Sequence, residues 1–203
     1  GNIMAIMAHP ERTQAGDAIF ASMRDYILEK PSIDIQIPPA TKIAAEFFPS
    51  FHHSNVEHEL IISLSITDNH AMTVEQTLQQ LGFTVQINRY THWEIHAEHQ
   101  SDYQKILDSE VLFSPRKEKT IKHHSLKTES SYCYLVRAKE DILGQQKAEI
   151  LQDYYALSAK PLIKHSLLWQ LNSATPLAQE EIDELLSTNI LGNRYAHEYF
   201  CYP

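Results

Sequence analysis

Apolar residues near the amino end form a continuous run followed by a helical stripe. The run Ile3–Ala8 predicts a strand that is buried on both faces. It ends at Pro10, which cannot donate a ladder hydrogen bond. Residues Asp17–Glu29 predict a helix, because one face collects the apolar side chains Ile19, Phe20, Met23 and Ile27. One strand and one helix cannot bury each other's apolar faces, so residues 1–30 predict a fragment of a larger α/β domain.

Residues 31–56 combine prolines with large apolar side chains. The prolines, which exclude a long helix, are Pro31, Pro38, Pro39 and Pro49. The isoleucines and phenylalanines between them are too apolar for a linker that is free in solvent. We therefore predict that the segment Ile33–Phe51 docks on the protein that follows it, or on a second copy of the chain in a homo-oligomer.

A set of elements begins after this connector. The pattern predicts a strand at Leu60–Ile66 and a helix at Ala71–Leu81. Two strands are predicted next, at Thr84–Tyr90 and Thr91–Glu98. A helix follows, opened by a capping box formed by Ser101 and Gln104.

A second set begins 72 residues after Leu60, with a strand at Tyr132–Ala138. It continues with a helix at Gln145–Leu157 and extended segments within Leu162–Leu171. Thr175 and Pro176 predict the N-cap and first residue of another helix, and Tyr195–Tyr202 predicts a last strand.

The shared order of elements is β-α-β-β-α, with a final strand evident only in the second set. This order predicts an α+β protein with two ferredoxin-like βαββαβ repeats and antiparallel sheets, at residues 57–116 and 131–203. The polar stretch Lys117–Ser130 is expected to divide the repeats.

Composition narrows the function classes. The chain has 26 acidic and 17 basic residues and a formal net charge of −9, which argues against nucleic-acid binding. The hydrophobic fraction of 43% is enough for a substantial core. No apolar run is long enough to span a membrane, and no signal segment opens the chain, so we expect a cytoplasmic protein without membrane contact. Two cysteines are too few for a disulfide framework or a cysteine zinc site.

The tripeptide His9–Glu11 is the first candidate for chemistry. A histidine at the end of a strand can act as a general base, and the carboxylate of Glu11 can hold its ring in the working tautomer. A surface turn without chemistry is the alternative. Residues Gly1–Met23 resemble the carboxyl end of class I glutamine amidotransferases, most of all the glutaminase subunit of phosphoribosylformylglycinamidine synthase.

That resemblance gives His9 and Glu11 the last two places of a catalytic triad whose first member is an upstream cysteine. The cysteines of this chain, Cys133 and Cys201, lie in predicted strands far downstream. A thiolate nucleophile is required for this chemistry. We therefore expect the chain by itself to be inactive as a glutaminase, with His9 and Glu11 an incomplete site.

The duplicated region resembles the small subunit of the same synthase. The resemblance rests on Thr73–Phe83 and Tyr90–Glu98 in the first set and on Leu185–Tyr195 in the second. It implies a non-catalytic scaffold that holds the glutaminase domain against the synthetase subunit, so that ammonia passes between them in purine biosynthesis. Two copies in one chain would reproduce a dimer of the free subunit. ATP and magnesium would belong to the synthetase, and no cofactor is expected in this chain.

Two other functions remain open. One is a stand-alone α+β ligand-binding or regulatory module with no purine role. The other is metal-assisted chemistry on the alternating residues His92, Glu94, His96 and Glu98, which would need a further ligand such as His70 or His99. The simpler interpretation of this alternation is a solvent-exposed polar face opposite a buried face of Trp93, Ile95 and Ala97.

Three further groups of residues are expected to be structural. The pairs His52–His53 and His123–His124 lie in predicted connectors and should be solvated. The basic stretch Arg116–Lys122 predicts a solvated hairpin or linker. The tyrosines near the end predict strand core and interface; they are Tyr195, Tyr199 and Tyr202.

Overall fold

The computed structural model describes residues 16–29, 48–53, 57–126, 128 and 130–203. The chain divides into two compact units, Gly1–Ala40 and Thr41–Pro203. In the first unit the helix α1 spans Asp17–Glu29, as predicted, and none of its side chains is buried. Its apolar residues include Phe20, Met23 and Ile27, which are all exposed. The predicted strand Ile3–Ala8 lies outside the described residues.

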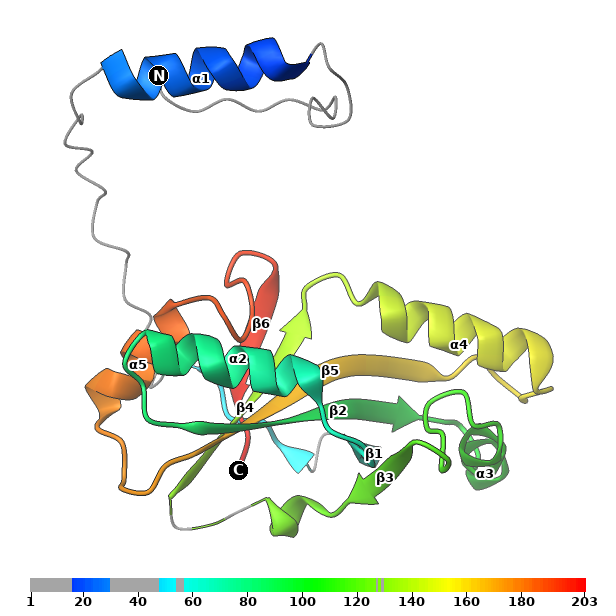
Figure 1. Ribbon diagram of the computed structural model, residues 1–203. Helices are drawn as coiled ribbons and strands as arrows, with labels where there is room; N and C mark the ends of the chain where they lie inside the picture. Colours follow the sequence, from blue (N-terminus) through cyan, green and yellow to red (C-terminus); the bar gives the residue numbers. More distant parts are fainter. Residues whose placement is uncertain (1–15, 30–47, 54–56, 127, 129) are drawn as a thin grey trace. The chain divides into compact units, whose positions relative to one another are not determined.

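The second unit is built on one six-stranded antiparallel sheet, so the α+β class is confirmed (Figure 1). Its strands are β1 (His58–Leu64), β2 (Gln86–His96), β3 (Glu118–Ile121), β4 (Ser131–Ala138), β5 (Leu162–Asn172) and β6 (His197–Cys201). The helices are α2 (Asn69–Gln80), α3 (Gln100–Asp108), α4 (Ile142–Tyr154), α5 (Gln179–Ser187) and the short 3₁₀ turn η5 (His123–Ser125). The strand order is β3-β1-β2-β5-β4-β6.

One strand replaces the two predicted between Thr84 and Glu98. β2 is continuous over 11 residues and pairs with β5 along its whole length, from Gln86↔Asn172 to His96↔Leu162. The predicted division at Tyr90 and Thr91 was wrong, because no glycine, proline or asparagine stands there to make a turn. Each half of the sheet therefore has the order β-α-β-α-β and departs from the predicted βαββαβ order.

The stretch Lys117–Ser130, which we expected to divide two repeats, contains β3. This strand pairs with β1 from Ile61↔Ile121 to Leu64↔Glu118, so the predicted boundary at residue 116 was too early. β3 forms one edge of the sheet. Charged side chains, lysine above all, are common on edge strands because they discourage further pairing, and they hide the strand pattern.

Two predicted helix starts were also wrong. α3 begins at Gln100 after His99, which makes no side-chain cap, so the predicted capping box of Ser101 and Gln104 does not form. α5 begins at Gln179, beyond the predicted start at Thr175 and Pro176. The carboxylate of Glu181 accepts a hydrogen bond of 3.0 Å from the Ala178 amide and satisfies one donor at this helix start.

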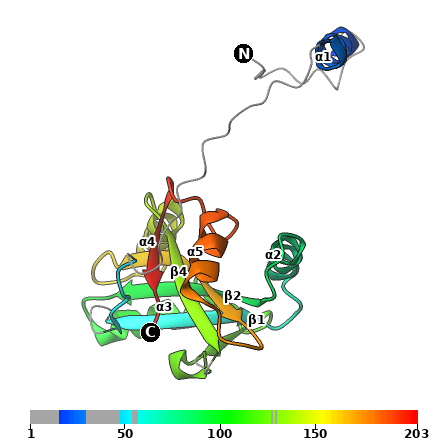
Figure 2. The same ribbon diagram turned by 90° about the vertical axis from the view of Figure 1, so that its left-hand side faces the viewer.

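The helices α2, α3, α4 and α5 pack on one face of the sheet, and the core beneath them contains side chains from both halves (Figures 1 and 2). One core cluster joins α2 from the first half to β4, β5 and α5 from the second, through Leu78, Trp169 and Leu185. The other joins α4 from the second half to β1, β2 and α3 from the first, through Leu151, Trp93 and Ile106. Both core clusters are therefore shared between the two halves.

The end of the connector lies against this unit, as predicted for the part of it that is described. Ser50 forms a parallel bridge with Cys201, and the Phe51 amide donates to the Cys201 carbonyl at 2.8 Å. The Phe48 ring stacks on Tyr199 with centroids 5.1 Å apart. The segment Phe48–His53 thereby extends the sheet beyond β6. Residues 31–47 lie outside the described residues.

Close contact between α4 and β5 depends on Gly144. A Cβ atom at this position would meet the Ile163 carbonyl oxygen at 2.5 Å and would also collide with the Asp141 carboxylate. Neither neighbour can withdraw without moving the backbone or the helix cap, since Asp141 caps α4 through the Gly144 amide at 2.8 Å.

We predict that Gly144→Ala lowers the free energy of unfolding by about 1–3 kcal/mol, the usual cost of overpacking. Urea unfolding followed by circular dichroism measures the change. Gln145→Ala, at an exposed position of the same helix, is the control and should change stability by less than about 0.5 kcal/mol. Equal stability of the two variants would contradict the packing described for α4.

Candidate functional site

A polar network lies on the side of the sheet opposite Trp93 and Ile95. His92 and Glu94 alternate with those residues along β2, so both project to this side. The sequence predicts an exposed face here, yet His92 is 0% and Glu94 is 3% exposed. The interpretation as a solvent-exposed face was therefore wrong for these two residues, whereas the burial of Trp93, Ile95 and Ala97 is confirmed.

The carboxylate of Glu59 on β1 is the centre of the first part of the network. His92 Nε2 lies 2.6 Å from Glu59 Oε1, and the Tyr202 hydroxyl donates to the same oxygen at 2.7 Å. His53 Nδ1 lies 3.0 Å from Glu59 Oε2. β1, β2, the connector and the carboxyl end of the chain thus meet at one carboxylate.

These contacts fix the protonation of the pair. Burial by itself would raise the pKa of Glu59, but hydrogen bonds from His92 and Tyr202 outweigh it and lower the pKa to about 2. Burial lowers the pKa of His92, although the bond to Glu59 acts in the opposite direction. Glu59 is therefore ionised and His92 neutral, with the proton on Nε2. His92 Nδ1 has no hydrogen-bond partner in the part of the chain that the structure describes.

Glu94 is the centre of the second part. Its carboxylate forms an ion pair with Arg137 on β4, and Lys164 Nζ on β5 lies 3.5 Å from its other oxygen. The side chain of Glu94 is 4% exposed, so this carboxylate is almost completely desolvated. Arg137 Nε also donates to the Ser166 hydroxyl at 3.0 Å, and the guanidinium lies over the Phe200 ring. Strands from both halves of the sheet therefore contribute to one buried ion cluster.

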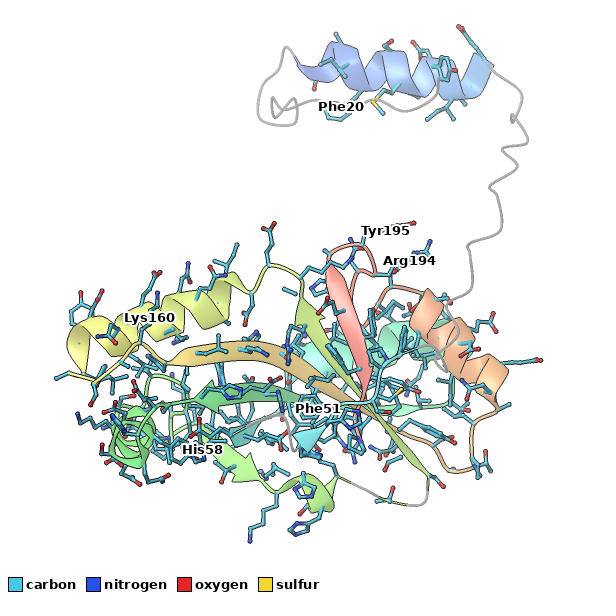
Figure 3. The ribbon with its side chains drawn as sticks, turned by 180° about the vertical axis from the view of Figure 1, so that it is seen from behind. Phe20, Phe51, His58, Lys160, Arg194 and Tyr195 are labelled. Carbon is cyan, nitrogen blue, oxygen red and sulfur yellow. The ribbon has the colours of Figure 1, made fainter. Side chains whose placement is uncertain are left out.

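Aromatic rings cover the Glu59 part of the network. Phe51 lies edge-on to His92 and stacks on Tyr202, with 5.3 Å between centroids in both pairs. Figure 3 shows Phe51 over the middle of the sheet. Glu59, His92 and the cross-strand neighbour Ser166 are the residue types of a nucleophilic triad. However, Ser166 is 1% exposed, so no substrate reaches it, and the arrangement is a buried polar network.

The residues predicted to carry chemistry are only partly placed. His9 and Glu11 lie outside the described residues. Among the residues that are described, no group of three or more histidine, cysteine, aspartate or glutamate side chains could hold a metal ion. Of the four proposed ligands, His92 and Glu94 are engaged in separate contacts, and Glu98 lies beyond the end of β2.

Other expectations had mixed outcomes. His52, His123 and His124 are exposed, as predicted, whereas His53 is half-buried and its ring contacts Glu59. Within the basic stretch Arg116–Lys122, residues Glu118–Ile121 form the strand β3. Tyr199 and Tyr202 are buried, as predicted, whereas Tyr195 is 74% exposed.

No protein-family model matches the sequence, and no curated protein matches it. Within the described ranges, none of the helices is long and apolar enough to cross a membrane.

The Glu59–His92 pair predicts a loss of stability in acid. The unfolded chain protonates His92 near pH 6.5 and Glu59 near pH 4.5, and both folded values are lower. The unfolded state thus binds more protons, and stability falls as the pH decreases below 6.5 and again from 4.5 towards 2. For Glu59 the difference between 4.5 and about 2 corresponds to roughly 3 kcal/mol.

Urea midpoints measured from about pH 7.5 to about pH 3 test this prediction. His92→Gln retains a donor to Glu59 but cannot titrate, so it should flatten the curve below pH 6.5. His99→Gln, at an exposed position, should leave the curve unchanged. Stability that is constant over the whole range would contradict the protonation states given above.

Proposed function

We propose that this chain is a non-catalytic bridging part of a phosphoribosylformylglycinamidine synthase, in which a tandem small-subunit module holds the glutaminase against the synthetase. The proposal starts from the two resemblances in the sequence. In this account ATP and magnesium belong to the synthetase, and His9 and Glu11 complete a site whose nucleophile lies outside this chain. The module would hold the glutaminase and the synthetase together, which raises the effective concentration of one enzyme near the other.

The tandem arrangement is supported by the order of elements. The series β1-α2-β2-α3-β3 and β4-α4-β5-α5-β6 are the same, and the sheet has equivalent strands at equal distances from its centre. Asp68 and Asp141, 73 residues apart, cap the first helix of each half. Trp93 and Trp169, 76 residues apart, are buried in the second strand of each half.

The observation that carries the proposal is the pairing of β2 with β5 along all 11 residues. It joins two equivalent halves into one sheet, as expected if the chain contains two copies of a subunit that would otherwise dimerise. His92, Glu94 and Ser166 are buried, so these reactive residue types have no access to a substrate. Their burial supports a scaffold role.

Size-exclusion chromatography tests the bridging role. The full chain, mixed with the synthetase and glutaminase subunits of the same organism, should elute with both. The complex should persist from low to physiological salt, since apolar contacts rather than charge are expected to dominate. The chain alone should release no glutamate from glutamine, and His9→Ala should not change that. Failure to co-elute with the synthetase under any ligand condition would favour the stand-alone binding module.

A further inference from the structure

The sheet is split between β1 and β2 at one end. Their pairing runs from His58↔Ile95 to Ile62↔Thr91 and stops there. β1 continues alongside β3 to Leu64↔Glu118, and the Ser65 amide then donates to the Lys117 carbonyl at 2.8 Å. β2 extends further, to Gln86, and among the described strands this extension has a neighbour on its β5 side only. The segment Gln86–Tyr90 is therefore an edge, although the rest of β2 lies between two strands.

A depression of about 250 Å³ follows this edge. Four consecutive residues of β2 line it: Ile87, Asn88, Arg89 and Tyr90. Because successive strand residues point to opposite faces, a depression that contacts four in a row runs along the edge of the strand. Its other walls come from the end of β1, the β1–α2 loop and the first turns of α2, through Ser63, Leu64, Ile66, Asp68, Ala71 and Met72.

A carboxylate takes the place of a strand carbonyl at this edge. The Ile87 amide donates to Glu75 Oε2 on α2 at 2.8 Å, so the amide points away from β5 and towards the depression. Backbone groups alternate along a strand, so those of Arg89 point the same way. The Ala97 amide lies just beyond the other end of β2 and donates to Glu57 at 3.1 Å. There too a carboxylate is the acceptor in place of a strand carbonyl.

The second half of the sheet closes its equivalent edge. β5 extends past the last β4 pair, Val136↔Leu167. There the His165 amide donates to Asp141 at 2.6 Å, and α4 lies close above β5 because residue 144 is glycine. In the first half, Asp68 instead accepts from the side chain of Arg89 at 2.8 Å, and α2 has Ala71 in the place of the glycine. The open edge of β2 is therefore not required by the architecture.

We infer that the Gln86–Tyr90 edge of β2 binds an extended segment of another protein chain, which adds to the sheet as an antiparallel strand. Its backbone would pair with Ile87 and Arg89 in place of Glu75. Apolar side chains of the segment would contact Met72 and Ile66, which are 48% and 71% exposed. Polar ones would lie near Ser63 and Asn88. Asp68 and Arg89 neutralise each other, so the segment is uncharged where it binds.

Amide chemical shifts of the full chain test this binding. The probe is the blocked peptide acetyl-Thr-Val-Thr-Val-Thr-amide, which alternates polar and apolar side chains. It should shift the Ile87 and Arg89 amide signals saturably and give nuclear Overhauser contacts between its α-protons and β2. The same peptide with all five residues N-methylated lacks the donors for strand pairing and should not bind.

Two variants of α2 locate the site. Met72→Glu should weaken binding of the peptide about fivefold or more, because it places a charge against the apolar side chains of the segment. Gln76→Glu adds the same charge at an exposed position of the same helix and should have no effect. Equal binding of the methylated peptide, shifts that do not saturate, or shifts that depend on protein concentration without peptide would each overturn the inference.

Discussion

Glu94→Leu is expected to lower the free energy of unfolding by about 3–5 kcal/mol, the cost of leaving a buried ion without its partner. The substitution leaves the Arg137 guanidinium, whose side chain is 13% exposed, without the carboxylate that it faces. It also leaves Lys164 and Arg137 as like charges without the carboxylate that both of them face. Urea unfolding of the full chain measures the loss.

Two controls separate the charge from the shape of the side chain. The double variant Glu94→Leu/Arg137→Met removes both charges and keeps an apolar stem near Phe200, so it should regain most of the lost stability. Glu98→Leu makes the same change at an exposed position of the same segment and should cost less than about 0.5 kcal/mol. A single Glu94→Leu variant as stable as Glu98→Leu would contradict the description of this cluster.

Each half of the sheet is expected to be unfolded when it is produced alone. Leu78 of α2 lies in a core cluster with Trp169 and Leu185 of the second half, and Leu151 of α4 lies in one with Trp93 and Ile106 of the first. A fragment of residues 57–128 or 129–203 therefore lacks part of each core cluster. Units of about 70 residues are marginal even when their cores are complete.

Circular dichroism and urea unfolding of the two fragments test this expectation. Each alone should lack a cooperative transition, and an equimolar mixture should recover one. The intact chain treated in the same way is the control. A cooperative transition in either isolated fragment would contradict the dependence of each half on core clusters that both halves share.

Local pattern was enough to predict most elements of the second unit. The apolar spacing of α2 and α4 and the strands β1, β4 and β5 follow from residues near one another in sequence. Errors arose where a local sequence pattern fits more than one structure. β2 was divided because its two stretches each resemble a complete strand, and β3 was missed because an edge strand can be mostly charged.

The buried polar network was beyond sequence reasoning for a different reason. The alternation of His92 and Glu94 with apolar residues is the same for an exposed face and for a buried polar one. The difference lies in the partners: Lys164 pairs opposite Glu94 only because β2 and β5 are neighbours. Glu59 is satisfied in part by Tyr202, 143 residues away. Such pairings depend on the strand order, which no short motif encodes.

Transfer of ammonia is the most direct test of the bridging role. Synthetase and glutaminase subunits are combined with and without this chain, and the formation of the amidine product is measured with glutamine or with ammonium as the nitrogen source. The account predicts that the chain increases the glutamine-dependent rate and leaves the ammonium-dependent rate unchanged. An equal glutamine-dependent rate with and without the chain would contradict it.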